Sequence, residues 1–452
     1  MTLTPIRLGW LLVSAALYAL LAYSIDRSQF TGLLGLYFLV VWGYSIRVRA
    51  IPELVSTTSP DRFFLLSAIL FRVILLLAPP HLSDDYARFA WDGRLLANGF
   101  NPYLYLPRSL LRTDIAQAAG LDADLFSRLN SPDYFTVYPP LNQAFFGIAA
   151  WLGGNNLSAT VVWLRAPILL AEIGTIYLLP RLLKRVGQNP NYALIYTLNT
   201  LVILELTGKI NFERVEIFIC LWAVWLLVTG KYWISALLFS LAVATKMLPL
   251  MGLPLLIRYL GWRKGLVYSG IVGVLTVALF LPFASLELIQ NVGSSIKLYF
   301  QKLEFNASIY YLIREAGYWL KGYNVIQQVG PWLSLITLGG ILWLSFGQIK
   351  ITIGTRLLLT LTLYFAMATT VHPWYITLVV MASVFTPFRY PLVWSALVWA
   401  SYATYQREPY VENMWLTTAE YIAVLAVGLL EWKQYRNKQQ AESATLHNNL
   451  PG

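Results

Sequence analysis

The chain has 452 residues, of which 58% are hydrophobic and only 12% are charged, and its formal net charge is +11. Because a typical soluble domain carries about 25% charged residues, this composition excludes water as the main solvent of the chain. The basic residues cluster in short loops between apolar runs, where they orient membrane helices, and this placement argues against nucleic acid as a partner.

Apolar runs recur from Leu8 to Trp432 and give about fourteen candidate spans of the bilayer, each of which needs about 20 residues. Several runs are short, so we expect about 12–14 transmembrane helices in one all-α polytopic domain that covers residues 1–432. Residues 433–452 are polar, and we expect them to form a disordered cytoplasmic tail. The expected spans begin near Leu8, Leu33, Phe63, Val162, Tyr192, Val215, Ile234, Pro249, Leu266, Trp332, Leu357, Tyr375, Leu392 and Trp415.

A long connection at residues 81–161 follows the third of these spans. Connections of this length inside a compact domain are usually functional. Two stretches within it, at about residues 84–98 and 138–153, have the pattern of interfacial helices. Counting the second stretch as a span would place the basic cluster at residues 181–185 outside, against the positive-inside rule. We therefore expect the long loop on the extracytoplasmic side and both termini in the cytoplasm.

Two adjacent carboxylates, Asp84 and Asp85, open the first of the two loop helices. Ser83 or Asp84 can cap the first amides, and Asp85 then lies in the first turn, where the helix dipole favours an anion. Alternatively, a carboxylate beside the bilayer surface can accept a proton from a sugar hydroxyl while a lipid phosphate departs. Spacing alone leaves both roles open.

Charged residues also interrupt two apolar runs at residues 208–216, on the same side of the membrane as the long loop. Charges at this depth are costly, so Lys209 and Glu213 are candidates for a functional site. An ion pair of Glu213 or Glu216 with Lys209 or Arg214 explains the same residues as structural.

Two further polar residues lie at breaks between later runs. Lys246 precedes a proline break, where it can bind a phosphate as a point charge or extend its stem to the interface. His372 lies between two runs in Val371-His372-Pro373-Trp374-Tyr375, and a lone interfacial histidine among aromatic residues is often structural.

Taken in chain order, these motifs resemble those of the GT-C class polyprenyl-phosphate-mannose-dependent mannosyltransferases. This class includes bacterial alpha-1,6-mannosyltransferases and, more distantly, the GPI mannosyltransferases. The resemblance is carried by Ser-Asp-Asp, Trp-Asp-Gly-Arg, Gly-x-Asn-Pro-Tyr, Tyr-Pro-Pro, Ala-Thr-Lys and His-Pro-Trp-Tyr between residues 83 and 375. It implies a GT-C fold and an inverting transfer of a hexose, with mannose preferred, to a lipid-linked or glycan acceptor on the extracytoplasmic face of a bacterial inner membrane.

The resemblance also implies roles for individual residues. Asp85 matches the catalytic base of the family, with Asp84 as its neighbour and fallback. The resemblance places Lys246 and His372 near the donor phosphate, and our mechanistic hypothesis adds Lys209 and Arg214 there. The residues expected at the sugar and the acceptor are Arg88, Trp91, Asp92, Tyr138, Asn211, Glu213, Trp374 and Tyr375.

No spacing of ligands in the sequence demands a metal, so we expect neither a metal nor another cofactor. The expected partners are a polyprenyl-phosphate sugar donor, a glycan or glycolipid acceptor and membrane lipid. The competing function is a transporter or flippase of a lipid-linked sugar, which can also have many spans and broken helices around buried charges. That class does not explain why carboxylates and aromatic residues concentrate in one long loop.

Overall fold

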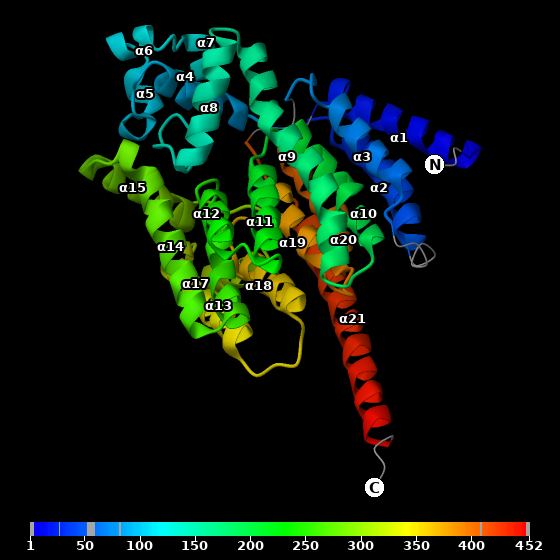
Figure 1. Ribbon diagram of the computed structural model, residues 1–452. Helices are drawn as coiled ribbons and strands as arrows, with labels where there is room; N and C mark the ends of the chain where they lie inside the picture. The colour runs from blue at the N-terminus through cyan, green and yellow to red at the C-terminus, as the bar shows by residue number, and fades with distance from the viewer. Residues whose placement is uncertain (1–3, 27, 52–58, 81–82, 407–408, 449–452) are drawn as a thin grey trace.

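The computed structural model describes residues 4–26, 28–51, 59–80, 83–406 and 409–448. These residues form helices and turns, together with one isolated β-bridge between Phe305 and Thr370. Figure 1 shows α4 to α8 gathered at one end of the molecule, while α21 extends to the opposite end and carries the C-terminus. The helices α1 to α3 lie along one flank.

The first half of the chain contains α1 (Pro5–Tyr23), α2 (Phe30–Arg49), α3 (Arg62–Ile74), α4 (Asp85–Ala97), η2 (Pro102–Leu104), α5 (Pro107–Leu110), α6 (Asp114–Ala118), α7 (Ala123–Ser127), α8 (Pro140–Gly153), α9 (Leu157–Arg185), η3 (Pro190–Tyr192), α10 (Ala193–Thr197), η4 (Val202–Gly208) and α11 (Glu213–Val228). The second half contains α12 (Tyr232–Val243), η5 (Leu248–Gly252), α13 (Leu253–Leu260), α14 (Trp262–Phe280), η6 (Leu281–Phe283), α15 (Leu286–Lys302), α16 (Ile309–Lys321), α17 (Ile326–Phe346), α18 (Ile353–Met367), η7 (Pro373–Tyr375), α19 (Ile376–Ser383), α20 (Tyr390–Leu397), η8 (Val398–Gln406) and α21 (Met414–Asn448).

Six helices in the described part of the chain are long and apolar enough to cross a membrane. They are Pro5–Tyr23, Phe30–Arg49, Leu157–Arg185, Trp262–Phe283, Ile326–Phe346 and Met414–Glu442, and four shorter apolar helices of 10–17 residues accompany them. The prediction of an all-α polytopic membrane protein is therefore confirmed. Length and composition identify six of the expected 12–14 spans. Several other expected spans form helices that are too short to be counted in this way, such as α3 with 13 residues and α20 with 8.

Buried charges hold the centre of the bundle together. α9 packs against α3, α4, α8 and α11, and its Glu172 pairs with Arg72 of α3 and with Arg214 of α11. All three side chains are fully buried. A guanidinium buried at this depth needs a carboxylate or carbonyl partner, and Arg72 also donates to the carbonyls of Ala68 and Thr197, each at 2.8 Å.

The long loop contains the two expected helices, as α4 and α8, but α4 differs from the amphipathic surface helix that its sequence predicts. Residues 87–95 are all buried, including the charged side chains among them. A Cβ atom at Gly93 would lie 2.3 Å from the carbonyl oxygen of Phe146, so the absence of a side chain there lets α4 and α8 pack backbone to backbone. The polar face of α4 is buried because the rest of the loop packs against it.

The C-terminal tail also differs from expectation. We expected disorder after Trp432, but α21 continues as a helix to Asn448. The residues of this segment include Gln, Lys, Glu, Arg and Ala, which are strong helix formers, so a polar composition here extends the helix into solvent and does not end it.

Candidate active site

A cavity of about 860 Å³ opens between the long loop and the helical bundle, a size typical of small-molecule sites. It receives side chains from the start of α4, the segment before α8, the start of α11, the turn after α12, α17, α18, η7 and η8. The predicted site residues that line it are Asp84, Asp85, Tyr138, Asn211, Glu213, Lys246, His372, Trp374 and Tyr375. Segments as far apart in sequence as residues 84 and 375 therefore form one site.

The two aspartates lie at the N-terminus of α4. Asp84 is the N-cap residue, but its side chain makes no capping hydrogen bond, and the backbone N–H of Asp85 instead donates to the Ser83 hydroxyl at 3.3 Å. The capping role thus falls to Ser83, and both carboxylates face the cavity.

Asp85 is held by a neighbour from the far end of the loop. The amide of Asn130 donates to Asp85 Oδ1 at 2.8 Å. Burial raises the pKa of Asp85, and the charges of Glu213 and Asp84 add to this effect, while the hydrogen bond from Asn130 and the charge of Lys209 oppose it. One carboxylate oxygen is thus fixed in place within a setting that makes the group a stronger base than an exposed aspartate.

Lys246 enters the cavity beside a carboxylate. Its ammonium forms an ion pair with Glu213 and lies over the ring of Tyr375, 4.2 Å from the centroid. Neither of the ion pairs expected for Glu213, with Lys209 or with Arg214, is formed, because Glu213 is the partner of Lys246. This pairing orients the ammonium toward the cavity, where its side chain stays 31% exposed.

The imidazole of His372 is stacked against two aromatic rings. Trp374 stacks on it with the ring centroids 4.3 Å apart, and Phe305 stacks on it at 4.9 Å. Burial, and then the charges of Lys209 and Lys246, lower the pKa of His372 to about 3, so the imidazole is neutral at physiological pH. Its Nδ1 has no hydrogen-bond partner among the described residues. His372 can therefore offer a single N–H to a ligand, not a positive charge.

A short strap, residues 303–306, brings Phe305 to this histidine. Phe305 N donates to the carbonyl of Thr369 at 3.1 Å, and Val371 N donates to the carbonyl of Phe305 at 2.8 Å. These bonds align the strap with the segment that leads into His372. Leu303 and Phe305, two residues apart, both line the cavity, as alternate residues of extended chain do.

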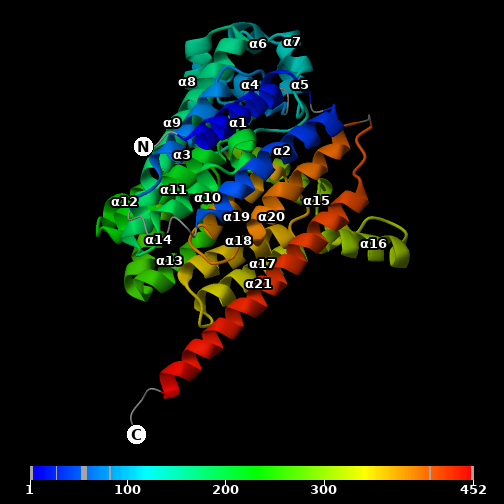
Figure 2. The same cartoon turned by 90° about the vertical axis from the view of Figure 1, so that its right-hand side faces the viewer.

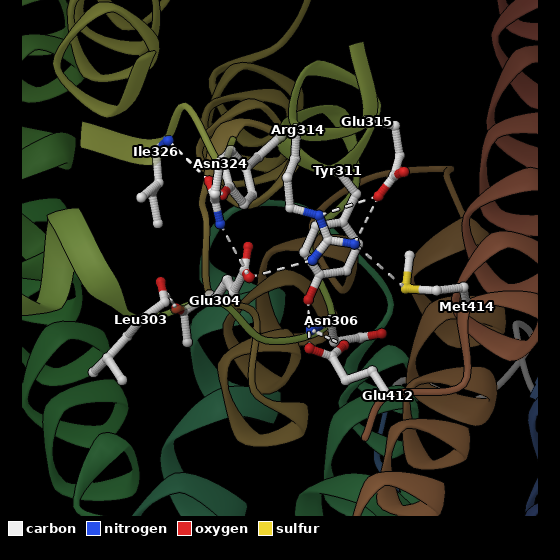
Figure 3. Close-up of polar contacts among 12 residues, drawn as sticks. Leu303, Glu304, Asn306, Tyr311, Arg314, Glu315, Asn324, Ile326, Glu412 and Met414 are labelled. Atoms are coloured by element: carbon white, nitrogen blue, oxygen red, sulfur yellow. Dashed lines mark hydrogen bonds and ion pairs between the residues drawn. The ribbon is translucent and has the colours of Figure 1, made fainter. Parts of the chain in front are cut away.

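The outer side of the strap is fixed by charged residues, which Figure 3 shows together. Glu304 pairs with Arg314 at 3.3 Å. Asn306 adopts a left-handed conformation with φ of 46°, and its backbone N–H donates to Glu412 at 2.7 Å. Tyr311 donates to the other oxygen of Glu412. The strap is therefore tied to α16 and to the segment just before α21.

One side of the cavity is apolar. Six residues of α17 line it at the spacing of a single helical face, and Leu248, Met251, Tyr364, Phe365 and Met367 add to this wall. The α17 residues are Gly330, Leu333, Ser334, Thr337, Leu338 and Ile341. We call the part of this surface that Leu333, Leu338 and Ile341 form the aliphatic wall.

Three predicted sugar or acceptor residues do not line the cavity, which corrects their expected placement. Arg88 and Asp92 form a buried ion pair at 2.8 Å within α4, and Arg88 also donates to the carbonyls of Ser131 and Tyr134. Trp91 is fully buried in the packing of α4 against the loop. The motif Trp-Asp-Gly-Arg therefore builds the loop that covers α4.

Two predicted phosphate ligands are also absent from the cavity lining, although the ammonium of Lys209 lies just behind it, 5.6 Å from the ring centroid of Trp374. Arg214 is buried in the ion-pair cluster with Glu172 and bonds the carbonyl of Val202. Lys209 pairs with Glu205 at 3.0 Å beneath the ring of Tyr402. A fully buried cation needs such partners within the protein, and these partners direct both side chains into the core.

The structure adds site residues that the sequence did not reveal. Asn130, Phe305, Tyr402, Tyr405 and Tyr410 all line the cavity. Asn130 precedes Ser-Pro in the sequence, which signals a turn but no partner. Phe305 reaches the site through pairing with residue 370, and no local pattern could indicate that contact.

No group of three or more His, Cys, Asp or Glu side chains in the described part of the chain could hold a metal ion. The three carboxylates that line the cavity are Asp84, Asp85 and Glu213, and Glu213 is paired with Lys246.

The fold and the cavity define a polytopic membrane protein whose polar site adjoins an aliphatic wall. Residues 1–261 match the family described as "Alpha-(1->6)-mannopyranosyltransferase, N-terminal domain", and the chain belongs to this family. A relative, alpha-(1->6)-mannopyranosyltransferase A of Mycobacterium tuberculosis, is 27% identical over 207 residues, which are 44% of this chain and 38% of the relative. The alignment thus covers less than half of either protein.

Proposed function

We propose that the protein transfers mannose from a polyprenyl-phosphate carrier to a glycan or glycolipid acceptor, on the extracytoplasmic face of a bacterial inner membrane. One observation carries the proposal: Asp85, Lys246 and His372 face the same cavity, and that cavity continues along the aliphatic wall. Membership of the mannopyranosyltransferase family supports mannose as the sugar. The positive-inside rule supports the side of the membrane and places both termini in the cytoplasm.

The aliphatic wall suits a lipid carrier. Leu333, Leu338 and Ile341 offer branched aliphatic surface on one face of α17. A polyprenyl chain that packs there is stabilised by about 25 cal/mol for each Å² of apolar surface that it buries. Its phosphate then reaches the polar end of the cavity, where Lys246 supplies a positive charge and His372 supplies an N–H.

The proposed reaction is a single displacement with inversion. Asp85 accepts the proton of an acceptor hydroxyl, and the hydroxyl oxygen forms a bond to the anomeric carbon. The bond from that carbon to the phosphate oxygen breaks on the opposite face, and the lipid phosphate leaves with the electron pair. Lys246 and His372 stabilise the charge that develops on it. Because a lipid phosphate is a stable leaving anion, the reaction as proposed uses no metal and forms no covalent sugar–enzyme intermediate.

The first test is transfer by the purified protein in detergent from radiolabelled polyprenyl-phosphate-mannose to a panel of mannosides. We expect wild-type product with an inverted anomeric configuration, and we expect Asp85→Asn to abolish transfer while the protein stays folded. Asp124→Asn is the matched control, because Asp124 lies in the same loop, its side chain is 70% exposed and its carboxylate pairs with Arg128 at the surface. That variant should transfer like wild type.

Retained turnover in Asp85→Asn would remove Asp85 as the base. If folded wild-type protein releases no sugar from polyprenyl-phosphate carriers of mannose, glucose or arabinose, the enzyme proposal fails. The protein would then be assayed in liposomes as a transporter or flippase of a lipid-linked sugar, the function that a large cavity among buried charges also permits.

A further inference from the structure

A second surface of the cavity is built from aromatic rings. Its inner part is the stack of Trp374, His372 and Phe305. Phe305 continues it to Tyr405, with the ring centroids 6.1 Å apart. Each of these rings lines the cavity, so the aromatic surface starts at the imidazole that faces the proposed donor phosphate.

Three tyrosines carry the surface outward. Tyr405 lies 5.7 Å from Tyr402 and 5.2 Å from Tyr410, between ring centroids. The exposure of the rings rises along this path: Tyr402 is 2% exposed, Tyr405 is half-buried and Tyr410 is 51% exposed. We call Tyr402, Tyr405 and Tyr410 the tyrosine file. It leads from the inner site to the exposed Tyr410, four residues before the start of α21, the helix that Figure 2 shows crossing one face of the bundle.

The tyrosine file and the aliphatic wall differ in chemistry. The aliphatic wall presents Leu and Ile side chains, which suit a hydrocarbon chain. At the outer end of the tyrosine file, Tyr405 and Tyr410 present aromatic rings with hydroxyl groups at their edges. The ring of Tyr402, at the inner end, is covered by the ammonium of Lys209, 3.7 Å from the ring centroid. A pyranose ring has the complementary surface, because its axial C–H groups form an apolar face and its hydroxyls lie around the rim. A file that ends in water also suits the sugar units of an acceptor, which lie in solvent.

We propose that Tyr405 and Tyr410 form an acceptor subsite, which binds a pyranose unit of a glycan at some remove from the unit whose hydroxyl reacts at Asp85. This inference rests on the proposed function, since it names the second substrate of the same cavity. It makes the preferred acceptor an oligosaccharide or a glycolipid with several sugar units. The tyrosines bind the acceptor without contacting the reacting atoms.

The test compares acceptors of different length. Initial rates are measured for mono-, di- and trimannosides with an alkyl aglycone, at saturating polyprenyl-phosphate-mannose. We expect Tyr410→Ala and Tyr405→Ala each to raise the KM for the trimannoside about 5- to 10-fold, the size of one aromatic contact, and to raise the KM for the monomannoside less. The KM for the lipid donor should not change.

Two further variants separate binding from folding. Tyr410→Trp keeps a flat ring at the exposed end and should restore the trimannoside KM toward the wild-type value. Tyr318→Ala removes a tyrosine that is 46% exposed on α16 and does not line the cavity, so it should change neither KM.

Three results would overturn the inference. A rise in the KM for the donor would assign the tyrosines to the lipid carrier. An equal rise in the KM for all three acceptor lengths would assign them a structural role. Unchanged KM values would show that they have no role in binding. A wild-type protein without transferase activity would instead contradict the proposed function. In that case, binding of the trimannoside by calorimetry, compared between wild type and Tyr410→Ala, still decides whether the subsite exists.

Discussion

At the scale of single residues, the setting of Asp85 determines how the reaction depends on pH. The base must be ionised, so activity falls as the pH falls through its pKa. Burial raises that pKa, and the hydrogen bond from Asn130 opposes the rise. The acid limb of the rate profile should therefore lie above the pH range of an exposed aspartate, whose pKa is about 3.9.

Replacing Asn130 by Ala removes the opposing hydrogen bond. We expect the acid limb of kcat/KM for Asn130→Ala to move to higher pH by about 1–2 units, because a hydrogen bond to a charged group contributes about 1.5–3 kcal/mol and one pKa unit corresponds to about 1.4 kcal/mol. At high pH the rate of the variant should approach the wild-type rate, whereas at low pH it should stay below the wild-type rate. The measurement is the transfer rate between pH 4 and 8 at subsaturating acceptor.

Asn98→Ala is the control for this variant. Asn98 lies at the C-terminus of the same helix, and its side-chain amide donates to the carbonyl of Arg94 at 2.8 Å. Its loss should lower stability slightly and leave the position of the acid limb unchanged. An unmoved limb in Asn130→Ala, with Asn130 gone and activity intact, would show that Asp85 is not the group that titrates.

The sequence predicted part of this site and missed the rest for a physical reason. Lys246 and His372 could be found because each is a polar residue at a break between apolar runs, where polar groups are costly. Asp85 was found by its place at the start of a loop helix and by the family resemblance. The free-energy cost of a polar group in an apolar run does not by itself distinguish a residue of a functional site from a residue that pairs within the core. Lys209 and Arg214 looked equivalent in sequence, but their partners Glu205 and Glu172 hold them in the core, and those pairings depend on packing between distant helices.

At the scale of elements, the strap at residues 303–306 shows how a non-helical segment becomes rigid. Asn306 is fully buried, its φ is 46°, and its amide donates to Glu420 at 3.3 Å. The left-handed conformation costs about 1–2 kcal/mol for an ordinary residue, and asparagine and glycine tolerate it best. The backbone at this position and its side-chain bonds therefore make separate contributions to stability.

Two substitutions separate these contributions. Asn306→Gly and Asn306→Ala both remove the bonds to Glu420, but only alanine strains the left-handed backbone. We expect Asn306→Ala to be less stable than Asn306→Gly by about 1 kcal/mol, and both to be less stable than wild type. The unfolding midpoint in detergent, followed by tryptophan fluorescence, measures the order. An alanine variant as stable as the glycine variant would show that the backbone does not hold this conformation.

The sequence predicted where the two helices of the long loop lie, but it did not predict that α4 is buried. The expected stretches at about 84–98 and 138–153 correspond to α4 (Asp85–Ala97) and α8 (Pro140–Gly153). Capping residues, prolines and Asn-Gly mark these ends locally. Burial of α4 on all sides depends on α5 to α8 folding back over it, and that is a tertiary event without a local signal.

At the scale of the whole molecule, one carboxylate joins three helices of the bundle. Glu172 on α9 pairs with Arg72 on α3 and with Arg214 on α11, and all three side chains are fully buried. The cluster holds two positive groups and one negative group. Removal of Glu172 therefore leaves two buried guanidinium groups facing each other without a counter-charge, whereas removal of Arg214 leaves a balanced pair.

This asymmetry gives a prediction that also decides the role of Arg214. We expect Glu172→Gln to lower stability by about 3–5 kcal/mol, the cost of an uncompensated buried charge, and Arg214→Met to lower it less. Glu315→Gln, whose side chain is 63% exposed, should match wild type. The folded fraction on size-exclusion chromatography in detergent after a heat challenge measures the order. If Arg214→Met instead folds normally and raises the KM for polyprenyl-phosphate-mannose, Arg214 contacts the donor phosphate, and the core role given to it by Glu172 is wrong.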